Sequence, residues 1–133
     1  MEQIARYPIN RLTVKAEVEQ LLAGRFVTYD GKSDEGDFTA VLAAARASRI
    51  FGVIERDSAD PRADPAPDTN DAMLRVPMCR SGSIARVLCS GEVKDGEEVQ
   101  VAANGQAVVL SDGTAVGEAK SAGKNSIIEV ELY

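Results

Sequence analysis

The 133-residue sequence contains no histidine and no tryptophan. Histidine is the side chain most used for acid and base catalysis near neutral pH, and it is the commonest ligand of transition metals. Its absence counts against an enzyme, and we expect no catalytic, cofactor-binding or metal-binding residues. Aromatic residues make up only 5% of the chain, so the core has to be built from Val, Ile, Leu and Ala.

Cysteine is almost as scarce. Cys79 and Cys89 are the only two, and neither belongs to a Cys-x-x-Cys pattern, so one chain offers too few ligands for a zinc site. Both fall in apolar segments typical of strands, and free cysteine is among the most often buried residue types. We expect two buried, reduced thiols, with a disulfide between neighbouring strands as the alternative.

Long apolar runs and an excess of basic charge are also missing. No segment approaches the roughly 20 apolar residues of a membrane span, and the opening sequence MEQIARYPINRLTV has charges and a proline where a signal peptide needs an apolar region. The formal net charge of -6 disfavours binding to nucleic acid or to an anionic membrane. The sequence therefore predicts a soluble protein made in the cytoplasm, with neither of these as a partner.

The length and the hydrophobic content of 44% are typical of one globular domain. We expect an extended N-terminal arm over residues 1–13, because its first ten residues show no periodicity and include Pro8. A single β-rich domain would follow over residues 14–133. Within it, residues 57–72 are rich in aspartate and proline, which predicts an acidic surface loop. A calcium site is the alternative there, although the Asp-x-Asp-x-Asp-Gly spacing is absent.

Two short helices are predicted in the first half of the chain. The first has apolar residues at the helical spacing i, i+4, i+7 and i+8: Val14, Val18, Leu21 and Leu22. It would be capped by Thr13 and would end at Gly24. The second is favoured by the alanine-rich composition of residues 39–48, with Asp37 as its cap.

Most of the remaining chain consists of short Val- and Ile-rich runs separated by turns that contain glycine. These runs predict strands over residues 25–30, 50–55, 74–80, 83–89, 98–103, 106–110, 114–119 and 126–132. Asn104-Gly105 is a dipeptide preferred in two-residue hairpin turns. The even spacing of the later strands favours a sandwich or a small closed barrel, with helices covering one side.

The motifs that could carry chemistry are incomplete. Gly31-Lys32-Ser33 lacks the earlier glycine of a phosphate-binding loop, because Phe26 stands in that position. Ser121 and Lys124 form a Ser-x-x-Lys pattern without its companion motifs. Two pairs of carboxylates are explained by strands with one solvated face: Glu97 with Glu98, and Glu129 with Glu131.

Six arginines are spread over the middle of the chain: Arg46, Arg49, Arg56, Arg75, Arg80 and Arg86. They lack the clustering and the interleaved aromatic rings of a nucleic-acid site. Because the guanidinium group is enriched at protein interfaces and binds carboxylates in a bidentate manner, we expect protein contacts instead.

Four segments resemble the bacteriophage capsid cement, or head decoration, proteins. They are GRFVTYDGK at 24–32, SRIFGVIERDSAD at 48–60, VPMCRSGSIARVLCSGEVKDGEEVQV at 76–101, and NGQAVVLSDGTAVGEAKSAGKNSIIEVELY at 104–133. The resemblance implies a β-rich barrel or tulip-like domain that binds the outside of an assembled shell of major capsid protein, often as a trimer near local threefold axes. Such a family has no catalytic or cofactor residues, so none are carried over.

We therefore expect a mainly β fold with minor α, a small β-barrel or β-tulip-like sandwich with one or two short helices. The expected function is that of a non-enzymatic viral structural protein on the exterior of the virion. It would bridge neighbouring major capsid protein subunits, with the arm and barrel-end loops as contact surfaces. Its acidic charge suits the outer surface of the shell better than a surface that faces DNA. The alternatives are a soluble small-molecule-binding β-barrel module, which requires an apolar pocket with a few convergent polar groups, and a hydrolase that uses carboxylates with Ser or Lys.

Overall fold

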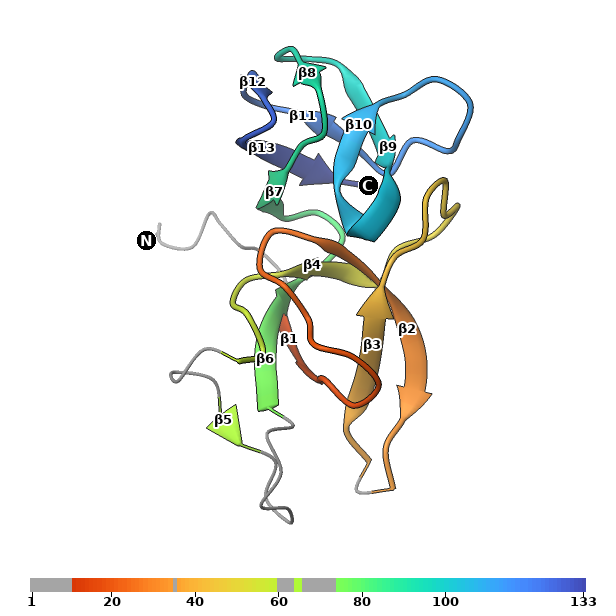
Figure 1. Ribbon diagram of the computed structural model, residues 1–133, viewed down its shortest axis with the longest axis vertical. Helices are drawn as coiled ribbons and strands as arrows, with labels where there is room; N and C mark the ends of the chain where they lie inside the picture. The colour runs from red at the N-terminus through yellow and green to blue at the C-terminus, as the bar shows by residue number, and fades with distance from the viewer. Residues whose placement is uncertain (1–10, 35, 60–63, 66–73) are drawn as a thin grey trace.

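The computed structural model describes residues 11–34, 36–59, 64–65 and 74–133 (Figure 1). Regular structure in these residues is almost entirely β. The strands are β1 Arg11–Lys15, β2 Phe26–Lys32, β3 Phe38–Leu42, β4 Gly52–Ile54, β5 Asp64–Pro65, β6 Leu74–Cys79, β7 Ile84–Leu88, β8 Glu92–Val93, β9 Glu98–Val101, β10 Ala107–Val109, β11 Gly117–Ala119, β12 Gly123–Lys124 and β13 Ile127–Leu132, with one 3₁₀ turn at Ala103–Gly105.

The N-terminal half of the chain forms a closed barrel. Five strands follow the order β1-β3-β2-β4-β6, and β6 pairs with β1 to close the ring. The closing pair is antiparallel and places Val14 opposite Val76, whereas β1 and β3 are parallel. The short strand β5 adds to β6. The expected small β-barrel is thus confirmed.

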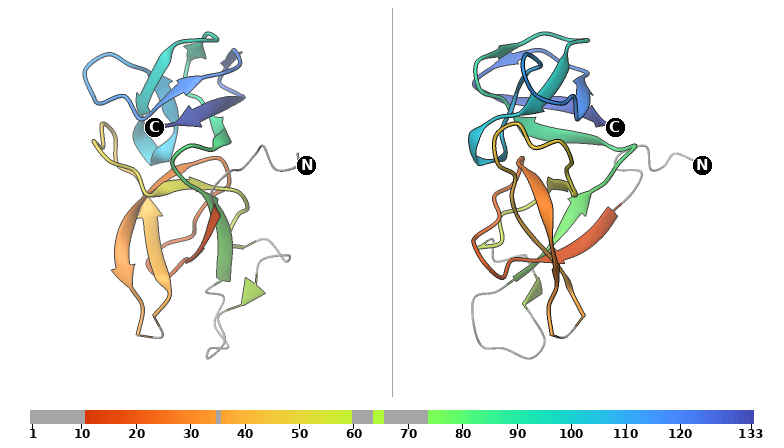
Figure 2. Two further views of the ribbon diagram at one scale, coloured as in Figure 1. Left: turned by 180° about the vertical axis from the view of Figure 1, so that it is seen from behind. Right: turned by 90° about the vertical axis from the view of Figure 1, so that its right-hand side faces the viewer.

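A second sheet lies at one end of the barrel, as the two views of Figure 2 show. Its five antiparallel strands have the order β10-β9-β11-β13-β7, and a small separate ladder joins β12 to β8. The strands β7 and β10 form the two edges of the larger sheet.

Two apolar clusters hold these parts together. One cluster is formed by barrel residues such as Val14, Val27 and Met78. The other contains Phe26 and Cys79 of the barrel together with buried residues of the second sheet, including Val87, Val99 and Ile128. Because the second cluster contains residues from both parts, the barrel and the sheet share an apolar core.

The two predicted helices are wrong. The first overlaps β1, and the residues between β1 and β2 form no regular element. Val14 and Leu21 are fully buried while Val18 is 67% exposed, so the apolar spacing does not form one face. The second segment begins in β3, which pairs with β2 as a hairpin. Intrinsic helix propensity is a weak preference, and strand pairing outweighs it in both segments.

The predicted strands are confirmed, since each of the eight ranges overlaps a strand of the structure, and β2 extends two residues beyond its predicted range. The turn at Asn104-Gly105 joins β9 to β10, and both residues have positive φ angles, 58° and 71°. The amide of Ala102 donates to the carbonyl of Gln106, and the amide of Gln106 donates back to Ala103. The two-residue strands β8 and β12 were not predicted, because runs of that length have no periodicity to detect.

Cys79 and Cys89 are buried and form no disulfide bond, as predicted. Of the expected arm over residues 1–13, residues 11–13 lie in β1 and the first ten are outside the described residues. The expected loop over residues 57–72, with its calcium alternative, falls largely on residues 60–63 and 66–73, which are also outside them.

Candidate functional site

The residues of the incomplete motifs have structural contacts. Ser33 accepts a hydrogen bond at Oγ from the amide of Asp37 in the turn between β2 and β3, at 3.1 Å. Ser121 Oγ accepts from the amide of Glu129 at 2.9 Å. Lys124 lies in β12, and its own amide donates to Ser126 Oγ. These contacts explain the two serines as turn-stabilising residues.

The carboxylates of the second sheet make ion pairs and hydrogen bonds on its outer face. Lys120 lies 3.0 Å from Glu118 and 3.3 Å from Glu131, and hydrogen bonds to both raise the pKa of Lys120. The Tyr133 hydroxyl donates to Glu98 at 2.7 Å, and this hydrogen bond is the main reason that the pKa of Tyr133 is raised to about 12. These contacts among exposed side chains agree with the prediction that the carboxylates lie on a solvated face of the sheet.

No three His, Cys, Asp or Glu side chains within the described ranges gather as a metal-binding group. In the same part of the chain, no helix is long and apolar enough to cross a membrane.

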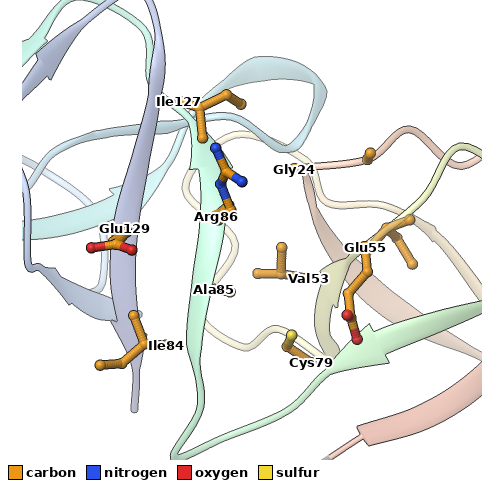
Figure 3. A pocket seen from close by; sticks show the side chains of 11 residues that line it. Gly24, Val53, Glu55, Cys79, Ile84, Ala85, Arg86, Ile127 and Glu129 are labelled. Atoms are coloured by element: carbon orange, nitrogen blue, oxygen red, sulfur yellow. The ribbon is translucent and has the colours of Figure 1, made fainter. Parts of the chain in front are cut away.

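A groove with a volume of about 430 Å³ lies between the barrel and the second sheet (Figure 3). Its barrel wall includes Val53 of β4 and Cys79 of β6, and its sheet wall includes Ile84 of β7 and Ile127 of β13. The remaining lining includes three charged residues: Glu55, Arg86 and Glu129. Figure 3 shows Glu55 and Glu129 on opposite sides of the groove.

Gly24 brings the loop before β2 close to β7 at one end of this groove. Its φ angle is +71°, which favours glycine, and its carbonyl accepts a hydrogen bond from the amide of Leu88 at 2.9 Å. A Cβ atom at this position would lie 3.4 Å from the carbonyl oxygen of Arg86. The residue that was expected to end a helix therefore joins the barrel to the second sheet.

An aromatic cluster on the barrel surface was not predicted. Tyr29, Phe38 and Phe51 account for three of the six aromatic residues in the sequence. The ring of Tyr29 lies 5.0 Å from that of Phe51 and 6.2 Å from that of Phe38, measured between centroids. Phe38 and Phe51 also pack against the barrel core, while Tyr29 is 51% exposed. The cluster thus extends from the core to solvent.

Cations surround this cluster. Lys32 Nζ and Arg80 Cζ each lie 5.0 Å from a ring centroid, over Phe38 and Phe51 respectively. Arg49 helps to line a shallow hollow of about 430 Å³ beside Tyr29, Phe38 and Phe51. We call these six residues the aromatic–cationic patch: Tyr29, Lys32, Phe38, Arg49, Phe51 and Arg80. Tyrosine and arginine over a partly apolar surface are typical of protein interfaces.

The other arginines of the predicted set are elsewhere. Arg46 donates to Asp112 at 3.0 Å, so it joins the loop after β3 to the loop after β10. Arg86 lines the groove, Arg56 has a partner of its own, and the side chain of Arg75 lies outside what the structure describes. Among the predicted arginines whose side chains are described, Arg49 and Arg80 are the two at the aromatic–cationic patch. No pattern in the sequence pointed to this patch, because its three aromatic residues come from separate segments.

Comparison with known proteins gives a family and a fold. A family model described as structural cement protein (E217 gp24/Pam3 gp6) matches residues 3–133. A solved structure titled as the crystal structure of the head fiber gp8.5 N base in bacteriophage phi29 has a similar fold, with a TM-score of 0.68 and 18% sequence identity. The similarity covers 93% of this chain and 95% of that one. No curated protein sequence matches.

Proposed function

Because a family model matches nearly its whole length, the chain belongs to the phage structural cement protein family, and we propose that it binds the outer surface of an assembled capsid and bridges neighbouring major capsid protein subunits. Family membership is the observation that carries this proposal. It gives the protein a structural role in the phage capsid, and bridging is the action by which such a protein would strengthen a shell.

The aromatic–cationic patch supplies a surface suited to that contact. Its exposed Tyr29 is anchored by two phenylalanines that pack on the barrel core, so little side-chain entropy is lost when a partner covers it. The chain has a net charge of -6, yet the patch itself contains three cationic side chains. We therefore propose that the patch binds an acidic, partly apolar segment of the major capsid protein.

Bridging would also make binding tighter, because the protein would contact several capsid subunits at once. One small patch gives modest affinity, but several patches engaged at once on a fixed lattice bind far more tightly. A homotrimer near a local threefold axis would present three identical patches, and we include that assembly in the proposal. The acidic charge favours the exterior of the shell over a surface that faces DNA.

Co-sedimentation with expanded capsids that lack the protein tests the binding. We expect the unmodified protein to sediment with the capsids at micromolar concentration. Arg80→Ala and Tyr29→Ala should weaken binding by at least about tenfold, as residues central to an interface do. Lys94→Ala removes a cation from an exposed turn of the second sheet and serves as the matched control with unchanged binding. No sedimentation of the unmodified protein would refute the function, whereas full binding by both patch variants would refute only the assigned surface.

A small-molecule-binding module remains the second candidate because the groove has the size of a ligand site. Its polar residues do not converge on one point, since Glu55 and Glu129 lie on opposite sides. The groove suits an extended chain better than a compact ligand.

A further inference from the structure

A second hollow adjoins the aromatic–cationic patch. It has a volume of about 320 Å³ and is lined by Ser48, Arg49, Ile50, Ala115, Val116 and Tyr133. Arg49 and Ile50 also line the hollow beside Tyr29, Phe38 and Phe51, so the two hollows share a wall. The second hollow lies where the loop before β4 meets the second sheet, and it continues the patch from the barrel onto that sheet.

The chain that follows β6 connects the same two places. Arg80 lies over the ring of Phe51, and the hydroxyl of Ser81, the next residue, donates to the main-chain oxygen of Tyr133 at 2.7 Å. The patch and the second hollow are thus neighbours through two separate segments of the chain.

Three hydrogen bonds hold Tyr133 beside the second hollow. Besides the bond from Ser81, its amide donates to the carbonyl of Val116 at 3.1 Å, and its hydroxyl donates to Glu98 at 2.7 Å. Tyr133 is nevertheless 54% exposed. A side chain that is already ordered and still exposed loses little entropy when a partner covers it. Tyr133 therefore offers a second anchoring ring, in addition to Tyr29.

Acidic side chains lie beyond Tyr133 on the second sheet. Glu98 of β9, Glu118 of β11 and Glu131 of β13 are directly opposite one another on neighbouring strands, and we call them the acidic row. Like charges in such positions destabilise a sheet. Lys120 pairs with Glu118 and Glu131, whereas the group that Tyr133 offers to Glu98 is an uncharged hydroxyl. The row therefore keeps an excess of negative charge, which a basic group of a partner would offset.

We propose that the two hollows form one binding track for an extended segment of the major capsid protein. Acidic residues of that segment lie over the aromatic–cationic patch, its apolar residues fill the hollows, and its basic residues lie over the acidic row. The inference rests on the proposed function, and it names the kind of capsid segment that the protein recognises.

Charge complementarity carries this assignment. The track has Lys32, Arg49 and Arg80 at its barrel end and the acidic row at its other end. Opposite charges on the two sides of an interface select the partner and fix its register. A segment that is acidic throughout would be repelled at one end of the track, and a segment that is basic throughout would be repelled at the other.

Co-sedimentation with expanded capsids that lack the protein tests the charge at the sheet end of the track. Glu98→Lys should weaken binding by at least about tenfold, because it places a cation where the basic residues of the segment lie. Glu92→Lys changes the net charge by the same amount in the exposed part of β8, outside both hollows, and should leave binding unchanged. Unchanged binding by Glu98→Lys would overturn the track. Equal weakening by the two variants would also overturn it, because net charge alone would then explain the effect.

A second matched pair tests the hollow itself. Ala115→Trp fills the second hollow, whereas Ala122→Trp places the same ring at an exposed position that lines neither hollow. With both variants shown to be folded by circular dichroism, Ala115→Trp should bind capsids at least about tenfold more weakly than Ala122→Trp. Equal binding by the two variants would contradict the proposal.

The same assay separates this inference from the proposed function. If the unmodified protein does not sediment with capsids, the proposed function is refuted and the track with it. If only Tyr29→Ala and Arg80→Ala weaken binding, the function and its barrel surface stand and the track alone is refuted. Sedimentation velocity without capsids examines a second copy as the occupant, and a loss of self-association in Glu98→Lys would overturn the assignment to the capsid protein.

Discussion

Among the glycines of the described residues, Gly52 in the barrel wall leaves the least room for a Cβ atom. A Cβ atom there would meet the carbonyl oxygen of Cys79 and would lie 2.7 Å from a side-chain atom of Met78. Because Cys79 contributes a backbone atom that cannot easily move, we expect Gly52→Ala to lower the free energy of unfolding by about 2–3 kcal/mol. Urea denaturation measures this change.

Gly31→Ala is the control for that substitution. Gly31 has a φ angle of +93°, and a Cβ atom there would meet nothing within 4 Å. The substitution introduces backbone strain alone, so it should lower the free energy of unfolding by about 1 kcal/mol. If both substitutions lowered the free energy of unfolding equally, close packing around Gly52 would not be the reason that glycine is needed there.

Gln100 organises the loop that follows β10. It is 3% exposed, and its Oε1 accepts from the amides of Ser111 and Gly113 at 2.7 and 2.9 Å. Its Nε2 donates to Asp112. We expect Gln100→Ala to destabilise the protein by about 2 kcal/mol, because two backbone amides lose their acceptor. Urea denaturation at neutral pH measures this change in the free energy of unfolding. A decrease smaller than that caused by an exposed substitution such as Lys94→Ala would contradict the prediction.

The pKa of Asp112 reports on the same contact. The hydrogen bond from Gln100 is the largest cause that lowers this pKa below its ordinary value of 3.8, followed among the favourable causes by the hydrogen bond from Arg46. A lowered pKa means that the fold favours the ionised carboxylate, so this stabilisation is present above pH 3.8 and is lost as the pH falls through the folded-state value. In an NMR titration, Arg46→Ala should raise the pKa of Asp112 towards 3.8, and an unchanged value would contradict the assigned cause.

Among the elements, β1 is the strand that closes the barrel. It pairs with β6 through all five of its residues, and Val14 is fully buried. We expect deletion of residues 2–10 to leave the protein folded, whereas deletion of residues 2–13 should abolish cooperative unfolding because it removes three of the five pairs that close the ring. Thermal denaturation followed by circular dichroism compares the two. A cooperative transition in the longer deletion would show that β1 is dispensable.

Strands with strict alternation could be predicted from the sequence. In β13, Ile128, Val130 and Leu132 are buried while Glu129 is exposed, and this pattern of period two is visible without a structure. The segments predicted as helices failed because their partners are distant in sequence. Val14 is buried by pairing with β6, and neither its neighbours nor local propensity signals that contact.

The candidate surfaces could not be predicted for a related reason. Tyr29, Phe38 and Phe51 belong to different segments, and only the folding of the barrel brings their rings together. The groove likewise combines Cys79 of the barrel with Ile127 of the second sheet, which are far apart in the sequence. Turn residues such as Gly105 were easier to predict, because a positive φ angle strongly favours glycine or asparagine at that position in the sequence.

At the scale of the whole molecule, the barrel and the second sheet form a platform joined by a shared apolar cluster. The platform presents a surface with aromatic and cationic side chains on a chain that is acidic overall. This combination suits a protein that holds other subunits in place, because a firm scaffold loses little entropy when it binds.

Bridging of neighbouring subunits should strengthen the capsid, and the temperature at which capsids release their DNA measures this most directly. Capsids saturated with the protein should rupture at a higher temperature than bare capsids, and the difference should increase with occupancy until every site is filled, because bridged subunits have to separate together. Arg80→Ala should give a smaller shift at the same protein concentration. A rupture temperature that stays unchanged while the protein is fully bound would contradict bridging.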